Sequence, residues 1–235
     1  MLRFICCLSF APLFLSALDS ESGRQLFSKV AERNQVRESQ LRTYTVLRTY
    51  EVRNSDDRVR SESKVLVQYT SPNPKVFKIL EEHGSHMIGN MVFRPLMDHE
   101  IKATSVEAKH DTSITPANYD VELKGEDELD GRRCYLLHLA PRRRDKYLFE
   151  GTIWVDFEDL AVAQIVGQPA KNPSFWVKKV QFTRRYQKIG DFWLPKQDTS
   201  VSEVKIFGKH TLTIRYEDYK LNEQPPPAAA VIKVE

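Results

Sequence analysis

From residue 40 to residue 221 the chain consists mostly of segments in which apolar and polar residues alternate, which is typical of strands with one buried face. In residues 40–53, for example, Tyr44, Val46, Tyr50 and Val52 fall on the same side. Further strands are expected at residues 58–69, 75–82, 118–124, 133–140, 146–157, 160–168, 175–189, 192–207 and 209–221. Several connections are tight, which favours antiparallel neighbours. Strands do not alternate with helices along the chain, which argues against a parallel sheet. The sequence predicts a mainly β (α+β) fold of about ten or eleven strands.

The N-terminal region has a different pattern. Residues 1–17 carry one early positive charge, Arg3, and an apolar run that ends in Ser16 and Ala17. This is typical of a secretory signal peptide and predicts a periplasmic protein, with an uncleaved N-terminal anchor as the alternative. A folded domain is expected over residues 18–222, beginning with a helix over 20–40, followed by an extended Pro/Ala tail over 223–235.

Composition and cysteine content narrow the function classes. The chain has 35 Lys and Arg against 32 Asp and Glu, a net charge of +3, and this near-neutral balance argues against a nucleic acid partner. Without residues 1–17 the only cysteine is Cys134, which excludes an intrachain disulfide. Cys134 lies in an apolar run, so we expect a buried and unreactive thiol.

A methionine-rich segment at residues 86–105 interrupts the strands. Its apolar residues recur at three- and four-residue spacing, which predicts short helices interrupted near Pro95. Methionine is common on adaptable apolar surfaces, so this insertion is expected either to form a lid or to pack as ordinary core. A strongly curved sheet of this size can enclose an apolar space. The expected architecture is therefore a curved antiparallel sheet with an N-terminal helix and a short helical lid that could close the enclosed space.

The sequence contains no recognisable catalytic motif. His83 and His86 lie near Glu100 in the chain, but H-x-x-H in a polar loop is a weak signal, and we expect no metal site, no cofactor and no catalytic residues. An exported enzyme would require these three side chains to converge in a cleft. The basic run Arg142–Arg144 favours either a solvated sheet face or contact with an anionic membrane surface.

Three local motifs carry a resemblance to a known family. They are Gly151-Thr-Ile-Trp-Val-Asp156, Leu160-Ala-Val-Ala-Gln-Ile-Val-Gly167 and Gly190-Asp-Phe-Trp-Leu-Pro195. With the order of elements over residues 20–222, they resemble the LolA/LolB-like superfamily of outer-membrane lipoprotein-sorting and periplasmic lipid-carrier proteins. The resemblance implies an unclosed β-barrel that holds acyl chains in its concave face under a helical lid.

These observations lead to one main hypothesis and one alternative. The main hypothesis is an exported, non-catalytic carrier of a lipid or lipoprotein acyl chain that exchanges cargo at a membrane surface or with a membrane-bound partner. The alternative is a periplasmic protein-interaction or sensor module of the same fold. For the carrier we expect the insertion to face the concave sheet and to move when cargo enters, although a slip of strand phase by one residue would invert the choice of strand residues. The expected ligand-binding residues are Val46, Val67, Met87, Ile88, Met91, Val92, Leu96, Trp154 and Phe182.

Overall fold

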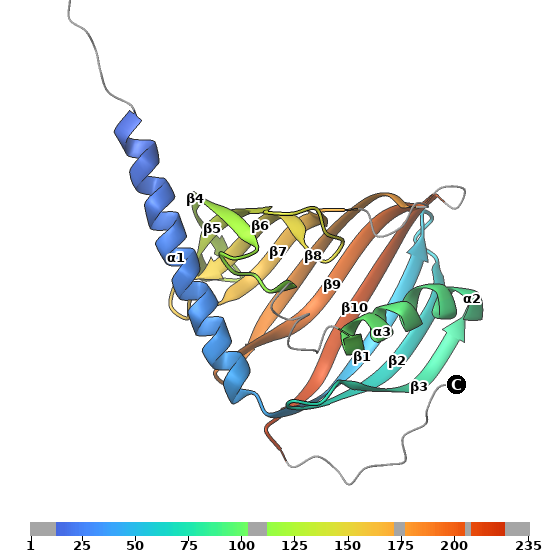
Figure 1. The fold of residues 1–235 in the computed structure, drawn as a ribbon. Coiled ribbons are helices and arrows are strands. Elements are labelled where there is room, and N and C mark those ends of the chain that lie inside the picture. The colour runs from blue at the N-terminus through green and yellow to red at the C-terminus, as the bar shows by residue number, and fades with distance from the viewer. Residues whose placement is uncertain (1–12, 103–111, 172–176, 205–207, 224–235) are drawn as a thin grey trace, which may run out of the picture.

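The computed structural model describes residues 13–102, 112–171, 177–204 and 208–223, which form one antiparallel sheet flanked by helices (Figure 1). The strands are β1 (Thr43–Asn54), β2 (Val59–Thr70), β3 (Val76–Gly84), β4 (Tyr119–Leu129), β5 (Arg132–Pro141), β6 (Phe149–Asp156), β7 (Val162–Pro169), β8 (Val177–Ile189), β9 (Phe192–Val204) and β10 (Gly208–Leu221). The helices are α1 (Leu13–Gln40), α2 (His86–Ile88), the π-helical turn η1 (Gly89–Phe93) and α3 (Arg94–Lys102).

The ten strands form a single open sheet in the order β3-β2-β1-β10-β9-β8-β7-β6-β5-β4. The first three strands form one meander and the last seven another, and the two are joined because β10 returns to pair with β1. In the described part of the chain the edge strands β3 and β4 do not pair with each other, so the barrel stays unclosed. The predicted fold class, a mainly β half-barrel with an N-terminal helix and a short helical segment, is confirmed.

The tight turns follow from residues that tolerate a left-handed backbone. Asp57 has φ 59°, and Asp130 and Gly131 have φ 52° and 77°, which suits the two-residue hairpin between β4 and β5. The sequence had suggested a longer turn over residues 125–131, and this is wrong. Strand β4 continues through Gly125 to Leu129, with a register irregularity between Leu123 and Gly125.

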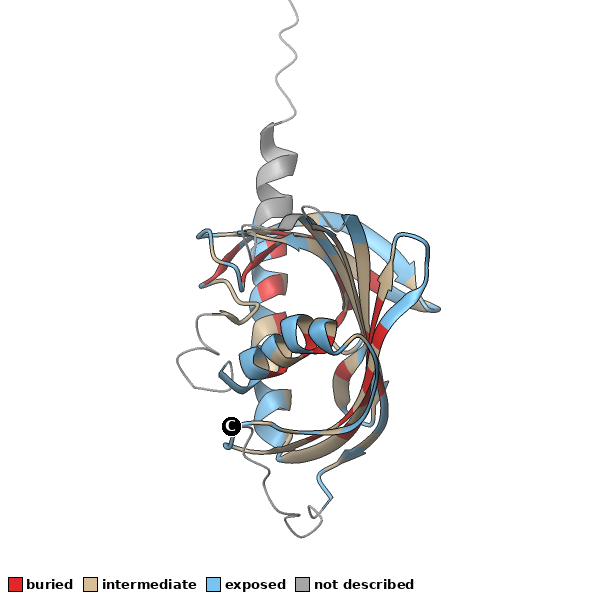
Figure 2. Cartoon of the chain, turned by 90° about the vertical axis from the view of Figure 1, so that its right-hand side faces the viewer, coloured by how far each residue is buried: buried red, intermediate tan, exposed pale blue. Residues whose placement is uncertain are grey.

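Both helical segments lie on the concave side of the sheet (Figure 2). Helix α1 contributes Phe27 and Val30, both fully buried, to a core cluster with residues of β4 to β7. The insertion contributes Phe93 and Met97 to a second core cluster, formed with β1, β2 and β10. The core is therefore divided between the two ends of the sheet, and strands β8 and β9 lie between them.

Two paired glycines allow β6 and β7 to approach closely. Gly151 lies opposite Gly167 in the antiparallel register. A Cβ atom on Gly167 would lie 2.6 Å from the backbone oxygen of Glu150, and one on Gly151 would collide with the backbone oxygen of Val166. Only glycine fits this approach, and Phe149 and Phe182 pack edge-to-face beside it with ring centroids 5.8 Å apart.

Substitution of Gly151 by alanine is therefore expected to destabilise the fold. The methyl group has no space against the β7 backbone, and overpacking of this kind costs about 1–3 kcal/mol. Urea unfolding followed by circular dichroism measures the effect. The matched control is Gly89→Ala, where the nearest atom to the new Cβ is Glu82 Oε1 at an ordinary 3.7 Å. Equal stabilities of the two variants would contradict the close approach.

The N-terminal helix starts earlier than predicted. Helix α1 begins at Leu13, whereas the sequence had suggested a start near Ser20. Most of the predicted signal peptide, residues 1–12, and most of the predicted tail, residues 224–235, lie outside the described residues. Among the described helices, none combines the length and the apolar character needed to span a bilayer.

Candidate functional site

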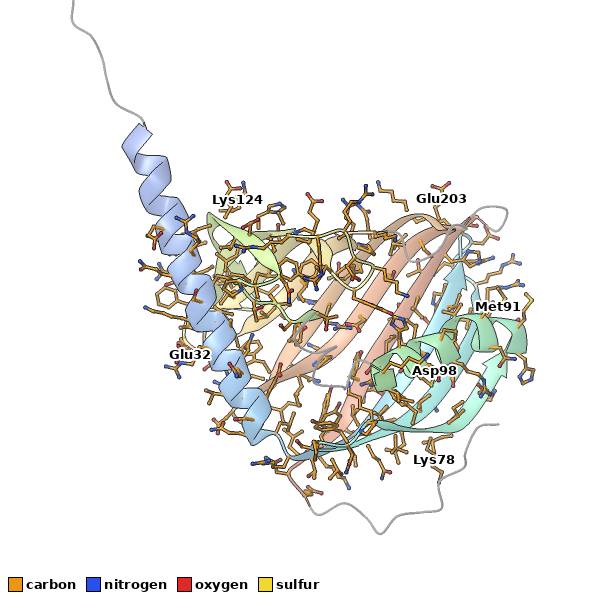
Figure 3. All side chains as sticks on the ribbon, in the orientation of Figure 1. Glu32, Lys78, Met91, Asp98, Lys124 and Glu203 are labelled. Atoms are coloured by element: carbon orange, nitrogen blue, oxygen red, sulfur yellow. The ribbon has the colours of Figure 1, made fainter. Side chains whose placement is uncertain are left out.

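The helical insertion presents a different face to the sheet from the one predicted. Met87 and Met91 are 61% and 69% exposed, and Figure 3 shows Met91 pointing away from the body of the molecule. The prediction that these two residues face the sheet is wrong, because Phe93 and Met97 occupy that position instead. Ile88 and Val92 pack against the same cluster, as predicted, and Leu96 is half-buried.

A π-helical turn before Pro95 explains the change of face. The backbone N–H of Arg94 donates to the carbonyl oxygen of Gly89, five residues earlier. Proline has no N–H group and its ring clashes with the carbonyl four residues before it, so a widened turn accommodates Pro95 without ending the helix. The extra residue in the turn rotates the apolar face, and the expected break at Pro95 becomes a bulge within a continuous helical segment.

Three of the four predicted strand residues face the concave side. Val46 and Val67 are paired across β1 and β2 and are fully buried beneath Phe93 and Met97, in the second core cluster. Phe182 packs against the cluster beneath α1.

Trp154 is on the opposite face, so its predicted place in the cavity is wrong. Its neighbours Ile153 and Val155 are fully buried in the cluster beneath α1, and side chains alternate along a strand. Its indole Nε1 donates to Asp127 Oδ2 at 2.9 Å. This is the one-residue slip of strand phase to which sequence patterns are prone.

A cavity lies between the C-terminal half of α1 and the concave face, away from the methionine-rich insertion. Its volume is ≈ 700 Å³, within the range of about 300–1,000 Å³ of small-ligand sites. Tyr186, Phe192 and Leu194 line one wall, and Ala31 and Glu32 belong to the helix wall. None of the nine predicted binding residues lines it. The α1 side chains after Val30 do not pack tightly on the sheet, which leaves this space open.

The family-like motifs converge on one wall of this cavity. Arg132 forms an ion pair with the buried Asp156, with Nε 2.5 Å from Oδ2, and its guanidinium lies 5.7 Å from the ring centroid of Trp193. The Trp193 indole donates to Asp159 Oδ2 at 2.9 Å, and Arg37 of α1 donates to the backbone oxygen of Asp159. Arg37 therefore anchors helix α1 to the β6–β7 turn, and the motif residues Asp156 and Trp193 hold that turn in place, which is a structural role.

An ionic cluster holds α3 against β1 and the start of β3. Glu100 Oε1 accepts from Arg48 Nη1 at 2.7 Å, and Glu100 Oε2 accepts from Lys75 Nζ at 2.9 Å. Arg48 is only 3% exposed and lies 4.7 Å above the ring of Tyr216. Burial raises the pKa of Glu100, but Lys75 and Arg48 outweigh it and lower the pKa to about 2. The sequence signal for Arg48 was a charged residue in phase with the apolar residues Val46 and Tyr50.

The residues considered for catalysis do not converge. His83 Nε2 lies 3.7 Å from Glu81 Oε2, whereas Glu100 bonds to Arg48 and Lys75. In the ranges that the structure describes, His, Cys, Asp and Glu form no group of three able to hold a metal ion. Cys134 is buried, as predicted, and burial raises the pKa of its thiol to about 11.

Of the basic run at residues 142–144, two arginines have polar partners close by. Arg142 Nη2 lies 2.9 Å from Asp120 Oδ1, and Arg143 Nη1 donates to Asn118 Oδ1 at 2.7 Å. All three arginines are exposed. The role of this run in membrane contact stays a prediction.

The fold resembles several solved structures at low sequence identity. No family model matches the chain, and no curated protein matches it. A putative outer-membrane lipoprotein-sorting protein domain from Vibrio parahaemolyticus is 14% identical, with a TM-score of 0.48 over 88% of this chain and 95% of that chain. The LolA superfamily protein NE2245 from Nitrosomonas europaea is 12% identical, with a TM-score of 0.46 over 86% and 95%.

A third similar structure is a DUF1329 family protein from Desulfovibrio piger, 15% identical, with a TM-score of 0.45 over 87% of this chain and 93% of that one. LolA superfamily proteins and lipoprotein-sorting domains are thus among the solved structures similar to this fold. At these identities and TM-scores, the function has to be argued from this chain's own residues.

Proposed function

We propose that this protein is an exported, non-catalytic carrier that binds the acyl chain of a lipid or lipoprotein in the cavity beneath α1, in lipoprotein sorting or lipid transfer to the outer membrane. The observation that carries the proposal is the ≈ 700 Å³ cavity between the C-terminal half of α1 and strands β7 to β9. Tyr186, Phe192 and Leu194 give it an apolar wall from the sheet. Residues 1–17 are the proposed signal peptide, and the periplasm is the proposed compartment.

Burial of an acyl chain supplies enough free energy for such a function. Each buried methylene contributes about 0.8 kcal/mol. A chain of about twelve methylenes therefore contributes roughly 10 kcal/mol before the costs of association are subtracted. The cavity has the volume for such a ligand.

The role of the insertion changes in this proposal. Phe93 of η1 and Met97 of α3 are almost completely buried against the sheet, so the insertion covers this end of the concave face. Movement of α3 on cargo entry stays a prediction, and it would first have to break these contacts and the Arg48–Glu100 ion pair. The cavity beneath α1 needs no such movement to receive a chain.

Mass spectrometry of the purified protein tests the function. Protein purified from membrane-containing cells is expected to yield close to one equivalent of a lipid on organic extraction, and the delipidated protein is expected to bind a fluorescent fatty acid saturably. Recovery of a stoichiometric protein partner instead, with no lipid and no fatty acid uptake, would favour the interaction-module alternative.

A further inference from the structure

An ion pair occupies the middle of the concave face, where the two apolar core clusters leave a gap. Arg184 of β8 and Asp198 of β9 are directly paired in the register. Their neighbours in the same cross-strand row are apolar on both sides, and residues in such a row share a face of the sheet. Across seven strands from β5 to β1 the row reads Leu137, Ile153, Ile165, Arg184, Asp198, Ile214 and Tyr50.

The side chain of Arg184 is partly exposed although it lies on the concave face. Its side chain is 43% exposed, whereas that of Asp198 is 16% exposed. Nε and Nη2 of Arg184 donate to the two carboxylate oxygens at 2.6 and 2.7 Å. The third guanidinium nitrogen, Nη1, carries two further N–H donors that Asp198 does not engage. Arg184 can therefore keep its bidentate pair and still donate to an anionic group of a ligand.

The Arg184–Asp198 pair belongs to a connected set of charged residues. Tyr216 donates its hydroxyl to Asp198 Oδ2 at 2.8 Å, and Arg48 lies over the Tyr216 ring, so the pair is continuous with the cluster that holds α3. This continuous set contains three cations, Arg184, Arg48 and Lys75, against the two carboxylates Asp198 and Glu100. In a partly desolvated face such an excess favours a bound anion.

The partly exposed Arg184 lies next to the proposed acyl cavity. Tyr186, which lines the cavity, is two residues from Arg184 on the same strand and therefore on the same face. Burial raises the pKa of the Tyr186 hydroxyl, and the positive charge of the nearby Arg184 opposes the rise. A chain lying along Tyr186 would bring its polar end to Arg184.

We propose that Arg184 binds the anionic head group of the cargo, so that the protein selects amphiphiles whose single chain ends in a carboxylate or a phosphate. This inference rests on the carrier function proposed above and names the class of its ligand. The chain lies in the cavity under α1, and the head group accepts hydrogen bonds from the free edge of Arg184. Charge-assisted hydrogen bonds of this kind are stronger than those to a neutral head group.

Binding of three lipids with the same chain tests the inference by isothermal titration calorimetry. The probes are palmitate, palmitoyl lysophosphatidylglycerol and uncharged monopalmitoylglycerol. The wild-type protein is expected to bind at least one of the two anionic lipids about tenfold more tightly than monopalmitoylglycerol. A preference for palmitate identifies a carboxylate head group, and a preference for palmitoyl lysophosphatidylglycerol identifies a phosphate head group. In Arg184→Gln the preference is expected to disappear, because the affinity for the anionic lipid falls toward that for monopalmitoylglycerol.

Two further variants keep the test decisive. Arg185→Gln removes the neighbouring arginine, which points to the other face and binds Asp130, and should keep the preference. If Arg184→Gln alone unfolds, the double variant Arg184→Gln/Asp198→Asn takes its place, because it also removes the carboxylate that has lost its partner. This double variant should lose the preference as well. Equal wild-type affinities, or a preference that survives the loss of Arg184, would overturn the head-group inference and leave the carrier function standing. Failure of all three lipids to bind would overturn both.

Discussion

Replacing Ala31 by tryptophan is expected to weaken acyl-chain binding about a hundredfold or more. Ala31 lies on the α1 wall of the cavity, and an indole there occupies space that the chain would fill. If about four methylenes lose their burial, roughly 3 kcal/mol of binding free energy is lost, about a hundredfold in Kd. Fluorescent fatty acid titration measures the effect. The helix is expected to stay in place, because Phe27, Val30 and Arg37 anchor it.

A tryptophan elsewhere on the same helix is the matched control. Val36 is exposed and does not line the cavity, so Val36→Trp should bind fatty acid like the wild type. Circular dichroism verifies that both variants are folded. Undiminished binding by a folded Ala31→Trp protein would show that the chain does not lie beneath α1, and the site would have to be sought elsewhere.

Replacing Glu100 by glutamine is expected to destabilise the protein by about 3 kcal/mol at pH 7. Removal of one partner of a buried ion pair leaves an uncompensated charge and costs about 3–5 kcal/mol. The lower end applies here, because Arg48 is 3% exposed but Glu100 is still 30% exposed. The free energy of unfolding in urea gives the comparison with the wild type.

The same substitution has a predicted pH dependence. The pKa of Glu100 is about 2 in the folded protein, below the ordinary value of 4.5. A carboxylate with a depressed pKa contributes stability above pH 4.5, and this contribution is lost as the pH falls toward 2. The stability difference between wild type and Glu100→Gln should therefore be full at neutral pH and shrink between about pH 4.5 and pH 2.

A double variant separates the unpaired charge from other causes. Arg48→Met/Glu100→Gln removes the buried cation as well, and methionine keeps much of the apolar contact with Phe77 and Tyr216. Most of the stability lost in Glu100→Gln should return, because loss of both partners of a buried pair is often close to neutral. A double variant as unstable as the single one would contradict this explanation and would point to the helix contacts of residue 100 instead.

The strands and their turns were predictable because their signals are local. Alternation of apolar and polar residues predicted every strand of the sheet, although β4 extends further than expected. The turn between β4 and β5 is an exception, because the sequence suggested residues 125–131 and the structure forms the turn from Asp130 and Gly131 alone. Antiparallel pairing followed from the short connections, whereas the open barrel was implied by the family resemblance of the local motifs.

The faces of individual segments were less predictable. Trp154 is one residue out of phase with the concave face, which takes Phe149, Ile153 and Val155. Its aromatic ring suggested a cavity residue, although Trp154 shares its face of β6 with Glu150 and Thr152. In the insertion, the spacing of Met87 and Met91 suggested the buried face, but the π turn before Pro95 placed Phe93 and Met97 there. A single extra residue in a helix turns every later side chain by about 100°.

The sequence by itself determined the strand-rich architecture, the buried and unreactive Cys134 and the two helical segments that flank the sheet. Only the tertiary structure decided that the cavity lies under α1 and that Arg184 pairs with Asp198 between two apolar clusters. The physical reason is that these features depend on the register of strands distant in sequence. Ile214 meets Tyr50 only because β10 returns to β1, and that pairing brings the Arg184–Asp198 pair into line with the cluster under α3.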